Sequence, residues 1–193
     1  METQRAGLPI EAFKTSKSFE QWLKKNHESA AGLWLKFYKK QSGVPTITYE
    51  EAVEVALCYG WIDGLANGYD EKSYLQRFTP RRPKSIWSKL NVERAEKLVE
   101  SGRMKPAGLK QIEAAKTDGR WQAAYDSPAN TELPKDFLAL LAKKPRAKKF
   151  FDTLNKTNRF AINWRLQTAR KPETREKRMK AIIEMLASGK KFH

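Results

Sequence analysis

The sequence predicts an α+β fold, in which an N-terminal domain with a small three-stranded antiparallel sheet packed by helices precedes an all-α helical domain. Runs rich in aromatic and β-branched residues occur only before Pro80. Apolar residues recur with helical spacing through most of the remaining chain. A polar segment rich in turn-forming residues, 126–131, separates the two parts. We therefore predict an α+β domain over 1–127 and a basic helical domain over 128–193.

The first predicted elements are a helix and a strand. Ser18 with Gln21 has the pattern of a capping box, and apolar residues at helical spacing follow, which predicts a short helix over 18–28. The aromatic run over 33–38 restarts the chain after a glycine and predicts a strand.

A buried helix and a hairpin are predicted next. Thr48 with Glu51 forms a second capping-box pattern, and the helix that it opens should end at Gly60. The second half of this helix is apolar on nearly every side, which predicts a central, buried position. The runs 61–64 and 74–78 flank Asn67-Gly68, a dipeptide typical of hairpin turns, so these runs complete the three strands.

Helices account for the rest of the chain. Asn91 can cap a helix that ends at Gly102, and Pro106 fits the first turn of another that ends near Gly119. Beyond the predicted linker, four helical segments open at Pro134, at Pro145, near 158 and at Pro172.

Positive charge is the dominant compositional feature. The chain has 38 Lys and Arg against 22 Asp and Glu, a net charge of +16. Residues 134–193 hold 17 basic and 5 acidic side chains, which leaves 21 and 17 for residues 1–133. This asymmetry suggests an anionic partner for the C-terminal part: nucleic acid, an anionic membrane surface, an acidic protein or an anionic small molecule. The alternative is a well-solvated basic surface with no dedicated partner.

Other composition features exclude several classes of protein. Cys58 is the single cysteine and lies in an apolar run, so we expect an inert thiol and no internal disulfide. With only His27 and His193 beside it, a zinc site of the usual kind is disfavoured, and no cofactor is predicted. No apolar stretch is long enough for a bilayer span and the first residues do not resemble a secretory leader, so we expect a cytoplasmic location.

The segment 77–91 is a candidate anion-binding loop. It combines arginines, lysines, hydroxyls and a tryptophan between two prolines, and it leads into a predicted helix N-terminus, which favours anions. An equally open interpretation is that its arginines pair internally with Asp63, Asp70 and Glu71. The candidate ligand-binding residues are Asp63, Arg77, Arg81, Arg82, Ser85, Trp87, Ser88 and Asn91.

Catalysis has little support in the sequence. Asp63 follows two large apolar residues and could act as a general base, with Arg81 and Arg82 holding a small anionic substrate. An Asp in such a position more often caps a turn or pairs with an Arg. A nucleophile elbow, a phosphate-binding glycine loop and a dinucleotide fingerprint are all absent from the sequence. The sequence therefore favours a non-enzymatic protein and nominates no catalytic residues.

The C-terminal helices offer a candidate basic surface. Aromatic and basic residues interleave over 158–165, a combination that can bind nucleic acid through phosphate contacts and stacking. The alternative is a helical bundle that buries Phe160 and Trp164 and leaves its bases in solvent. The candidate surface residues are Arg159, Arg165, Arg175, Lys177, Arg178 and Lys180.

Several of these segments together resemble the YdeI/OmpD-associated family, also called bacteriocin-protection proteins. The resemblance runs from about residue 18 to the end, and its most specific motifs are Trp61-Ile62-Asp63-Gly64 and Thr79-Pro80-Arg81-Arg82. Further matches are Ser85-Ile86-Trp87-Ser88, Gly119-Arg120-Trp121, Asn158-Arg159-Phe160 and the run 169–175. The resemblance implies association with an outer-membrane porin and resistance to cationic antimicrobial peptides, and it supplies no catalytic residues. Some family descriptions imply a periplasmic location. This sequence departs from that description, because we expect no secretory leader.

Three functional hypotheses follow. The first is a non-enzymatic stress or protection factor that binds an anionic partner through a basic surface. The second is a nucleic-acid-binding module built on the C-terminal helices, and the third is an enzyme for a small anionic substrate at a pocket of Asp63, Arg81 and Arg82. Direct binding of cationic peptides is disfavoured because a chain of net charge +16 repels them, so protection should be indirect.

Overall fold

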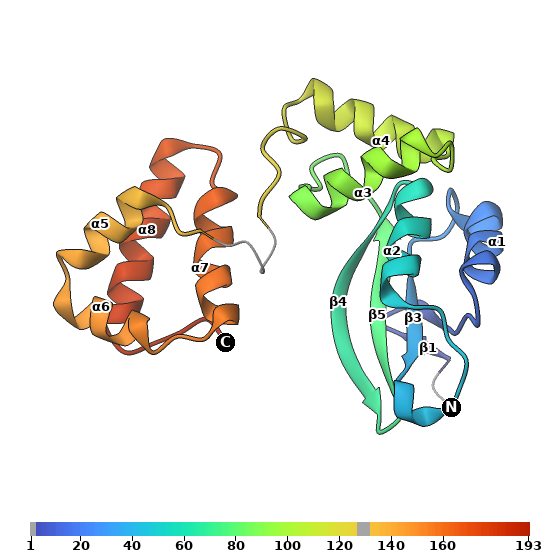
Figure 1. Cartoon of the computed structure of the whole chain (residues 1–193), viewed down its shortest axis with the longest axis horizontal. Coiled ribbons are helices and arrows are strands. Elements are labelled where there is room, and N and C mark those ends of the chain that lie inside the picture. Colours follow the sequence, from blue (N-terminus) through green and yellow to red (C-terminus); the bar gives the residue numbers. More distant parts are fainter. Residues whose placement is uncertain (1–2, 127–131) are drawn as a thin grey trace. The chain divides into compact units, whose positions relative to one another are not determined.

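The computed structural model describes residues 3–126 and 132–193, shown in Figure 1. The chain divides into two compact units. The first comprises Met1–Trp87 and Asn91–Ala123, and the second comprises Ser88–Leu90 and Ala124–His193. All but the first residue of the predicted linker lies outside the described residues, so the predicted boundary at 127 stays a prediction.

A five-stranded sheet forms the centre of the first unit, with the strand order β1-β2-β3-β5-β4. Strand β2 runs parallel to β3, and the other neighbouring strands are antiparallel. The strands are β1 (Gln4–Arg5), β2 (Leu8–Glu11), β3 (Leu33–Tyr38), β4 (Trp61–Asp70) and β5 (Ser73–Pro80).

The three predicted strands are present as β3, β4 and β5 and pair antiparallel, but the predicted number was wrong, because β1 and β2 add two strands and β2 runs parallel to β3. Strands β1 and β2 were missed because they are two and four residues long, and Pro9 removes a backbone donor from β2. Asn67 and Gly68 lie inside β4 rather than at the hairpin turn. The turn follows Asp70, whose carboxylate accepts hydrogen bonds from the Lys72 amide (2.9 Å) and the Ser73 hydroxyl (2.6 Å). An aspartate that binds the backbone two residues onward also stabilises a turn.

Two helices cover one face of this sheet. The helices are α1 (Ser16–Asn26) and α2 (Tyr49–Cys58). Phe19 of α1 meets Phe78 with ring centroids 5.8 Å apart, and Tyr49 of α2 meets Phe37 at 6.5 Å. Phe37 shares its face with Leu33, which lies opposite Phe78 in the strand register. Both helices therefore pack on the same side.

The caps of these helices show where the sequence interpretation was right. Thr48 and Glu51 form the predicted capping box of α2, and Gly60 has the left-handed conformation (φ 71°) expected after a helix. For α1 the box is Thr15 with Ser18, so Ser18 is the last residue of the box, at position N3, rather than its first. The helix consequently begins at Ser16, ahead of the predicted start.

Two further helices are α3 (Lys89–Glu100), which belongs to the first unit from Asn91 onward, and α4 (Pro106–Thr117) of the first unit. A short 3-10 turn, η1 (Lys40–Ser42), follows β3. The prediction that Asn91 caps α3 was wrong, because the helix begins two residues earlier and buries Asn91. The Lys89 amide at its start donates to the Tyr125 carbonyl (2.9 Å), so this orphan donor is satisfied by backbone rather than by an Asn side chain.

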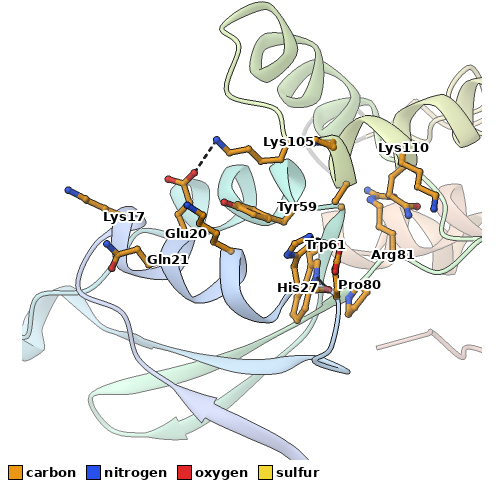
Figure 2. A pocket seen from close by; sticks show the side chains of 16 residues that line it. Lys17, Glu20, Gln21, His27, Tyr59, Trp61, Pro80, Arg81, Lys105 and Lys110 are labelled. Atoms are coloured by element: carbon orange, nitrogen blue, oxygen red, sulfur yellow. Dashed lines mark hydrogen bonds and ion pairs between the residues drawn. The ribbon is translucent and has the colours of Figure 1, made fainter.

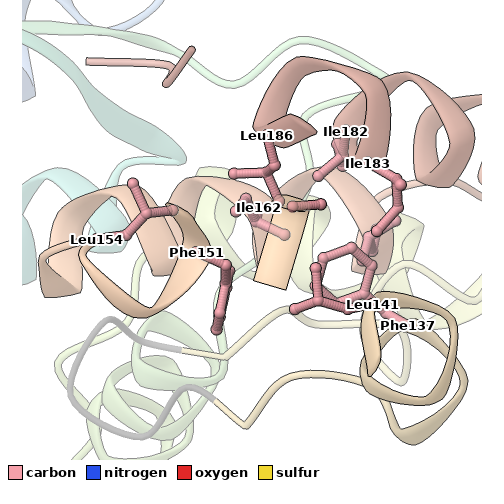
Figure 3. Packing of buried hydrophobic residues seen from close by; sticks show 10 residues of the cluster. Phe137, Leu141, Phe151, Leu154, Ile162, Ile182, Ile183 and Leu186 are labelled. Atoms are coloured by element: carbon pink, nitrogen blue, oxygen red, sulfur yellow. The ribbon is translucent and has the colours of Figure 1, made fainter. Parts of the chain in front are cut away.

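Four helices build the second unit: α5 (Lys135–Ala142), α6 (Pro145–Asp152), α7 (Lys156–Gln167) and α8 (Pro172–Ala187). Pro145 and Pro172 occupy the first helical position, as predicted, and Asn155 caps α7. Figure 3 shows the core, in which Phe137, Leu141, Phe151, Ile162 and Leu186 are among the buried side chains. Within the described residues, none of the helices combines the length and the apolar character that a bilayer span requires.

Candidate functional site

A cleft of about 900 Å³ opens on the first unit beside α1 and the N-terminal turn of α4 (Figure 2). Five cationic side chains line the cleft, together with two carboxylates, which leaves an excess of three positive charges. The charged lining residues are Lys17, Lys24, Arg81, Lys105 and Lys110 on the positive side and Glu20 and Glu28 on the negative side.

Helix α1 forms one wall. Lys17, Gln21 and Lys24 recur at a spacing of four and three residues, so they share one face of the helix. Glu20 on the same wall pairs with Lys105 Nζ across the cleft at 3.5 Å, drawn as a dashed line in Figure 2. This pairing neutralises one carboxylate and leaves the lysines of α1 as the main charges of the wall.

Aromatic side chains form the floor and are held in place by hydrogen bonds and ring contacts. Trp61 Nε1 donates to the His27 carbonyl (3.1 Å), and the His27 ring meets the Tyr59 ring edge-on at 5.1 Å. Burial, followed by the nearby charge of Glu20, raises the pKa of Tyr59 above its ordinary value. The Tyr59 hydroxyl therefore stays protonated and neutral at physiological pH.

The N-terminus of α4 forms the opposite wall. Lys105 occupies the N-cap position without a capping side-chain bond, and Pro106 and Ala107 of the first turn line the cleft. This close approach needs Gly60, because a Cβ there would lie 2.9 Å from the Ala107 carbonyl oxygen. Unpaired amides and the helix dipole make this end of α4 favourable for an anion.

Arg81 connects the cleft to the predicted anion-binding loop. It is 5% exposed, and its guanidinium carbon lies 3.5 Å from the centroid of the Trp87 ring. Its Nη1 donates to the Ile86 carbonyl (3.2 Å), and its backbone amide donates to the Gly60 carbonyl (2.9 Å). Arg81 therefore fixes the loop while its positive charge contributes to the cleft wall.

A second buried arginine, Arg120, holds the same loop. Arg120 is 3% exposed, pairs with Asp118, and donates from Nη1 to the Ser85 carbonyl (2.8 Å). The Trp87 ring, which contacts the Arg81 guanidinium, also meets the Trp121 ring, with centroids 4.8 Å apart. The loop is thus shaped by side chains that bind its carbonyl groups.

The remaining loop residues do not converge on the cleft. Arg82 is exposed, and its amide donates to Ser85 Oγ (2.9 Å). Ser88 belongs to the second unit, where it forms a bridge with Tyr125. Asn91 lies within α3 and accepts a hydrogen bond from Arg94.

Asp63 and Arg77 lie on the sheet, away from the cleft lining. The Asp63 carboxylate accepts a hydrogen bond from the Tyr49 hydroxyl (2.7 Å), and burial together with this bond raises the pKa of Tyr49 above its ordinary value. Arg77 Nε is buried and has no hydrogen-bond partner among the described residues. The predicted pocket of Asp63, Arg81 and Arg82 is therefore absent, since only Arg81 lines the cleft.

Internal pairing of the loop arginines with Asp63, Asp70 and Glu71 was the alternative interpretation. Two of these carboxylates have other partners, because Asp63 binds Tyr49 and Asp70 pairs with Lys36 at 3.3 Å. The arginine contacts that hold the loop include two carbonyl groups and a tryptophan ring.

In the second unit, most of the predicted surface cations make contacts within the unit. Arg159 donates to the carbonyls of Leu154 and Asp152, and Arg175 pairs with Asp136, which lowers the pKa of that carboxyl. Lys180 pairs with Glu176 at 2.8 Å. Arg178 donates to the Arg165 carbonyl, and the Arg165 guanidinium lies over the Phe192 ring. Lys177 is exposed.

Other cations of the second unit are less engaged. Of the seventeen basic residues over 134–193, six make side-chain contacts within the unit. They are Arg159, Arg165, Arg175, Arg178, Lys180 and Lys148, which pairs with Asp152. The other eleven make no ion pair or side-chain hydrogen bond with any residue that the structure describes. They are Lys135, Lys143, Lys144, Arg146, Lys149, Lys156, Arg170, Lys171, Lys177, Lys190 and Lys191.

The cleft itself was missed by sequence reasoning, apart from Arg81. Its cations come from α1 and α4, which are far apart in the chain, and a lysine face on an amphipathic helix is indistinguishable from an ordinary solvated face. The short segment before Pro106 was the available indication, because a proline-started helix without a capping side chain leaves an uncapped N-terminus. The described residues hold no cluster of three or more His, Cys, Asp or Glu side chains suited to a metal ion.

Comparison with known proteins separates the two parts of the chain. Residues 11–111 match the model of a family described as a domain of unknown function, DUF8412, and all the residues that line the cleft fall in this range. Residues 130–189 match the family described as bacteriocin-protection, YdeI or OmpD-associated, which confirms the resemblance for this part. No curated protein and no solved structure shows significant similarity to the chain.

Proposed function

The chain belongs to the family of domains of unknown function DUF8412 and carries a YdeI/OmpD-associated domain after it, and from this premise we propose a non-enzymatic, bacteriocin-protection-like protein that binds an anionic partner. The cleft of the first unit is the proposed binding site. The observation that carries the proposal is its excess of cations: five against two carboxylates, one of which is already paired with Lys105.

Electrostatics favours a partner with several negative charges. Lys17, Lys24 and Lys110 extend from two walls of one concavity, and low-dielectric walls concentrate their field. The N-terminus of α4 adds the positive end of a helix dipole. A phosphate-bearing small molecule or an acidic segment matches this arrangement, whereas a cationic peptide is repelled by it. Protection against such peptides would then act indirectly, through the anionic partner.

A binding role is favoured over catalysis by the surroundings of Asp63. Its carboxylate already accepts the Tyr49 hydroxyl and lies outside the cleft lining, so Asp63 is not placed to act as a general base beside Arg81. A cytoplasmic location belongs to the same proposal, supported by the single, buried thiol of Cys58. Fractionation of cells that express the natural gene would test the location.

Calorimetric titration with inorganic pyrophosphate tests the cleft. We expect binding at low ionic strength that weakens as salt rises. The double variant Lys24→Gln/Lys110→Gln should raise the Kd about tenfold or more, since it removes two cations of the cleft. Lys97→Gln/Lys39→Gln is the matched control, because it removes the same charge at exposed positions outside the cleft. The proposal fails if pyrophosphate gives no heat at low salt, or if the control weakens binding equally.

Nucleic-acid binding by the second unit is a second candidate, favoured by its eleven unengaged cations. Lys143, Lys144 and Arg146 lie within four residues at the α5–α6 junction, and Lys149 follows one helical turn later. A gel-shift series with single-stranded and duplex DNA should give a log–log salt slope of about −0.9 per phosphate contact. The triple variant Lys143→Gln/Lys144→Gln/Arg146→Gln should reduce that slope. Absence of any shift at low salt removes this candidate.

A further inference from the structure

A second cavity, of about 440 Å³, lies within the second unit and is separate from the proposed anion cleft. Helix α7, helix α8 and the C-terminal tail all contribute to it. Its walls include Trp164, Met185 and Phe192, and its charged lining residues are Arg165 and Arg178. We propose that this cavity binds a small amphipathic carboxylate, with an alkyl or aryl body against the apolar walls and its carboxylate on the arginines.

The charge of the lining favours an anion. Both ionisable side chains that line the cavity are arginines, and the remaining lining residues are apolar. A guanidinium is planar and always charged, and its paired N–H groups match the two oxygens of a carboxylate. A ligand that lacks a negative charge would leave this pair without a counterion in an otherwise apolar cavity.

Arg178 is fixed in a way that leaves donors for a ligand. Its Nη1 donates to the Arg165 carbonyl (2.7 Å) and to Thr168 Oγ1 (3.2 Å), both at the C-terminal end of α7. Its Nε and Nη2 groups donate to no acceptor in the described part of the chain. A guanidinium anchored through one nitrogen keeps its orientation, so its other donors lose little freedom when a carboxylate binds.

The tail wall of the cavity is also held in place. The His193 amide donates to Asn158 Oδ1 (3.2 Å), and Asn158 Nδ2 donates back to the His193 carbonyl (3.4 Å). Phe192 precedes His193 in the tail, and its ring lies against the Arg165 guanidinium. The guanidinium carbon is 3.9 Å from the ring centroid. These contacts pre-form the wall before a ligand arrives, which is typical of small-molecule sites.

The volume and the apolar walls select the body of the ligand. Small-molecule sites have volumes of roughly 300–1,000 Å³ and combine mostly apolar walls with a few placed polar groups. Acetate would use the arginines but not Trp164 or Met185. A carboxylate with a chain of about eight carbons would use both parts, because each methylene that it buries against the apolar walls adds to the affinity.

Calorimetric titration of the full chain with octanoate, 1-octanol and acetate tests the proposal. Octanoate should bind, and 1-octanol and acetate should each bind at least about tenfold more weakly. 1-Octanol keeps the apolar chain but has no carboxylate, and acetate keeps the carboxylate but has no chain. Equal binding of octanoate and 1-octanol would show that the arginines take no part and would overturn the proposal. Absence of octanoate binding would overturn it as well.

Variants assign the site. Arg178→Gln should raise the octanoate Kd about tenfold or more, and Lys177→Gln, one residue away and outside the cavity lining, should change it by less than about twofold. Because Arg178 also binds α7, Ala181→Trp is the second variant: it fills the cavity from an exposed position of α8 and should abolish octanoate binding. Octanoate binding that survives Ala181→Trp contradicts the assignment. Pyrophosphate binding in the first unit should be unchanged by all three variants, which separates the two proposals.

Discussion

Replacement of Gly108 by alanine tests the contact that positions α4, and with it one wall of the cleft. A Cβ at Gly108 would lie 2.6 Å from the carbonyl oxygens of Leu57 and Cys58 at the end of α2, and Met104 Sδ would be closer still. In an unhindered helix, Gly→Ala stabilises by about 1 kcal/mol. Here two of the three neighbours are backbone atoms, so overpacking at the upper end of its usual range, about 3 kcal/mol, opposes that gain. We expect a net loss of about 2 kcal/mol.

Urea unfolding followed by tryptophan fluorescence measures this loss. With an m-value of about 2 kcal/mol/M, the midpoint of the first unit should fall by about 1 M. Gly68→Ala is the control, because no atom lies within 4 Å of a Cβ there, and its midpoint should stay within about 0.3 M of the parent. If Gly108→Ala is as stable as the parent or more so, α4 does not approach α2 this closely and the cleft wall is misplaced.

Four further outcomes are expected. Arg120→Met should cost the first unit about 2 kcal/mol in thermal unfolding, because the Ser85 carbonyl loses a charged donor at a part-buried site, whereas Lys97→Met should change little. Ile162→Ala should cost the second unit about 2–5 kcal/mol in urea unfolding, because it leaves a cavity in the core of Figure 3. The hydrogen bond from Arg175 lowers the pKa of Asp136, so the pair stabilises the fold above the ordinary carboxyl pKa. This contribution is lost as the pH falls and the carboxylate is protonated. Between about pH 5 and 3 the parent should therefore lose more stability than Asp136→Asn. Burial raises the pKa of Cys58 to about 11, so iodoacetamide at about pH 8 should alkylate the urea-unfolded chain but not the folded chain, as read by mass spectrometry.

Local interactions are what the sequence predicts well. The Thr48–Glu51 capping box and the left-handed Gly60 depend on residues within one helical turn, and both were confirmed. Pro145 and Pro172 open helices for an equally local reason, because a proline costs nothing where the amide has no helical partner. The positions of these helices could therefore be predicted without knowledge of the tertiary structure.

Long-range pairing explains what was missed. Strand β2 is short and contains Pro9, and it exists because Ile10 and Glu11 pair in parallel with β3, more than twenty residues onward in the chain. Asn91 has the composition of a cap, but a backbone contact to Tyr125 starts the helix earlier. In both cases a backbone partner that is distant in the chain determines the local structure. No local sequence pattern indicates that partner.

The candidate site follows the same division. Arg81 was singled out by the density of charge around it, and its partners include a carbonyl group and a tryptophan ring, which a pattern of charges does not predict. Lys24 and Lys110 meet in one cleft only because α1 and α4 flank the same end of the sheet unit. Composition identified a basic protein, and the location of the concave basic surface required the fold.

Strand β4 has a consequence for how the chain behaves at high concentration. It is an edge strand with Leu65 60% exposed, and its pairing with β5 shifts register between Asp63 and Ala66 and again between Gly68 and Asp70. Each shift bends and twists the strand, so a strand from another molecule could match its backbone groups over only a few residues at a time. The irregular edge thereby discourages self-association through an otherwise open row of amides and carbonyls, and straightening it by deletion of one bulged residue would invite fibrous aggregates.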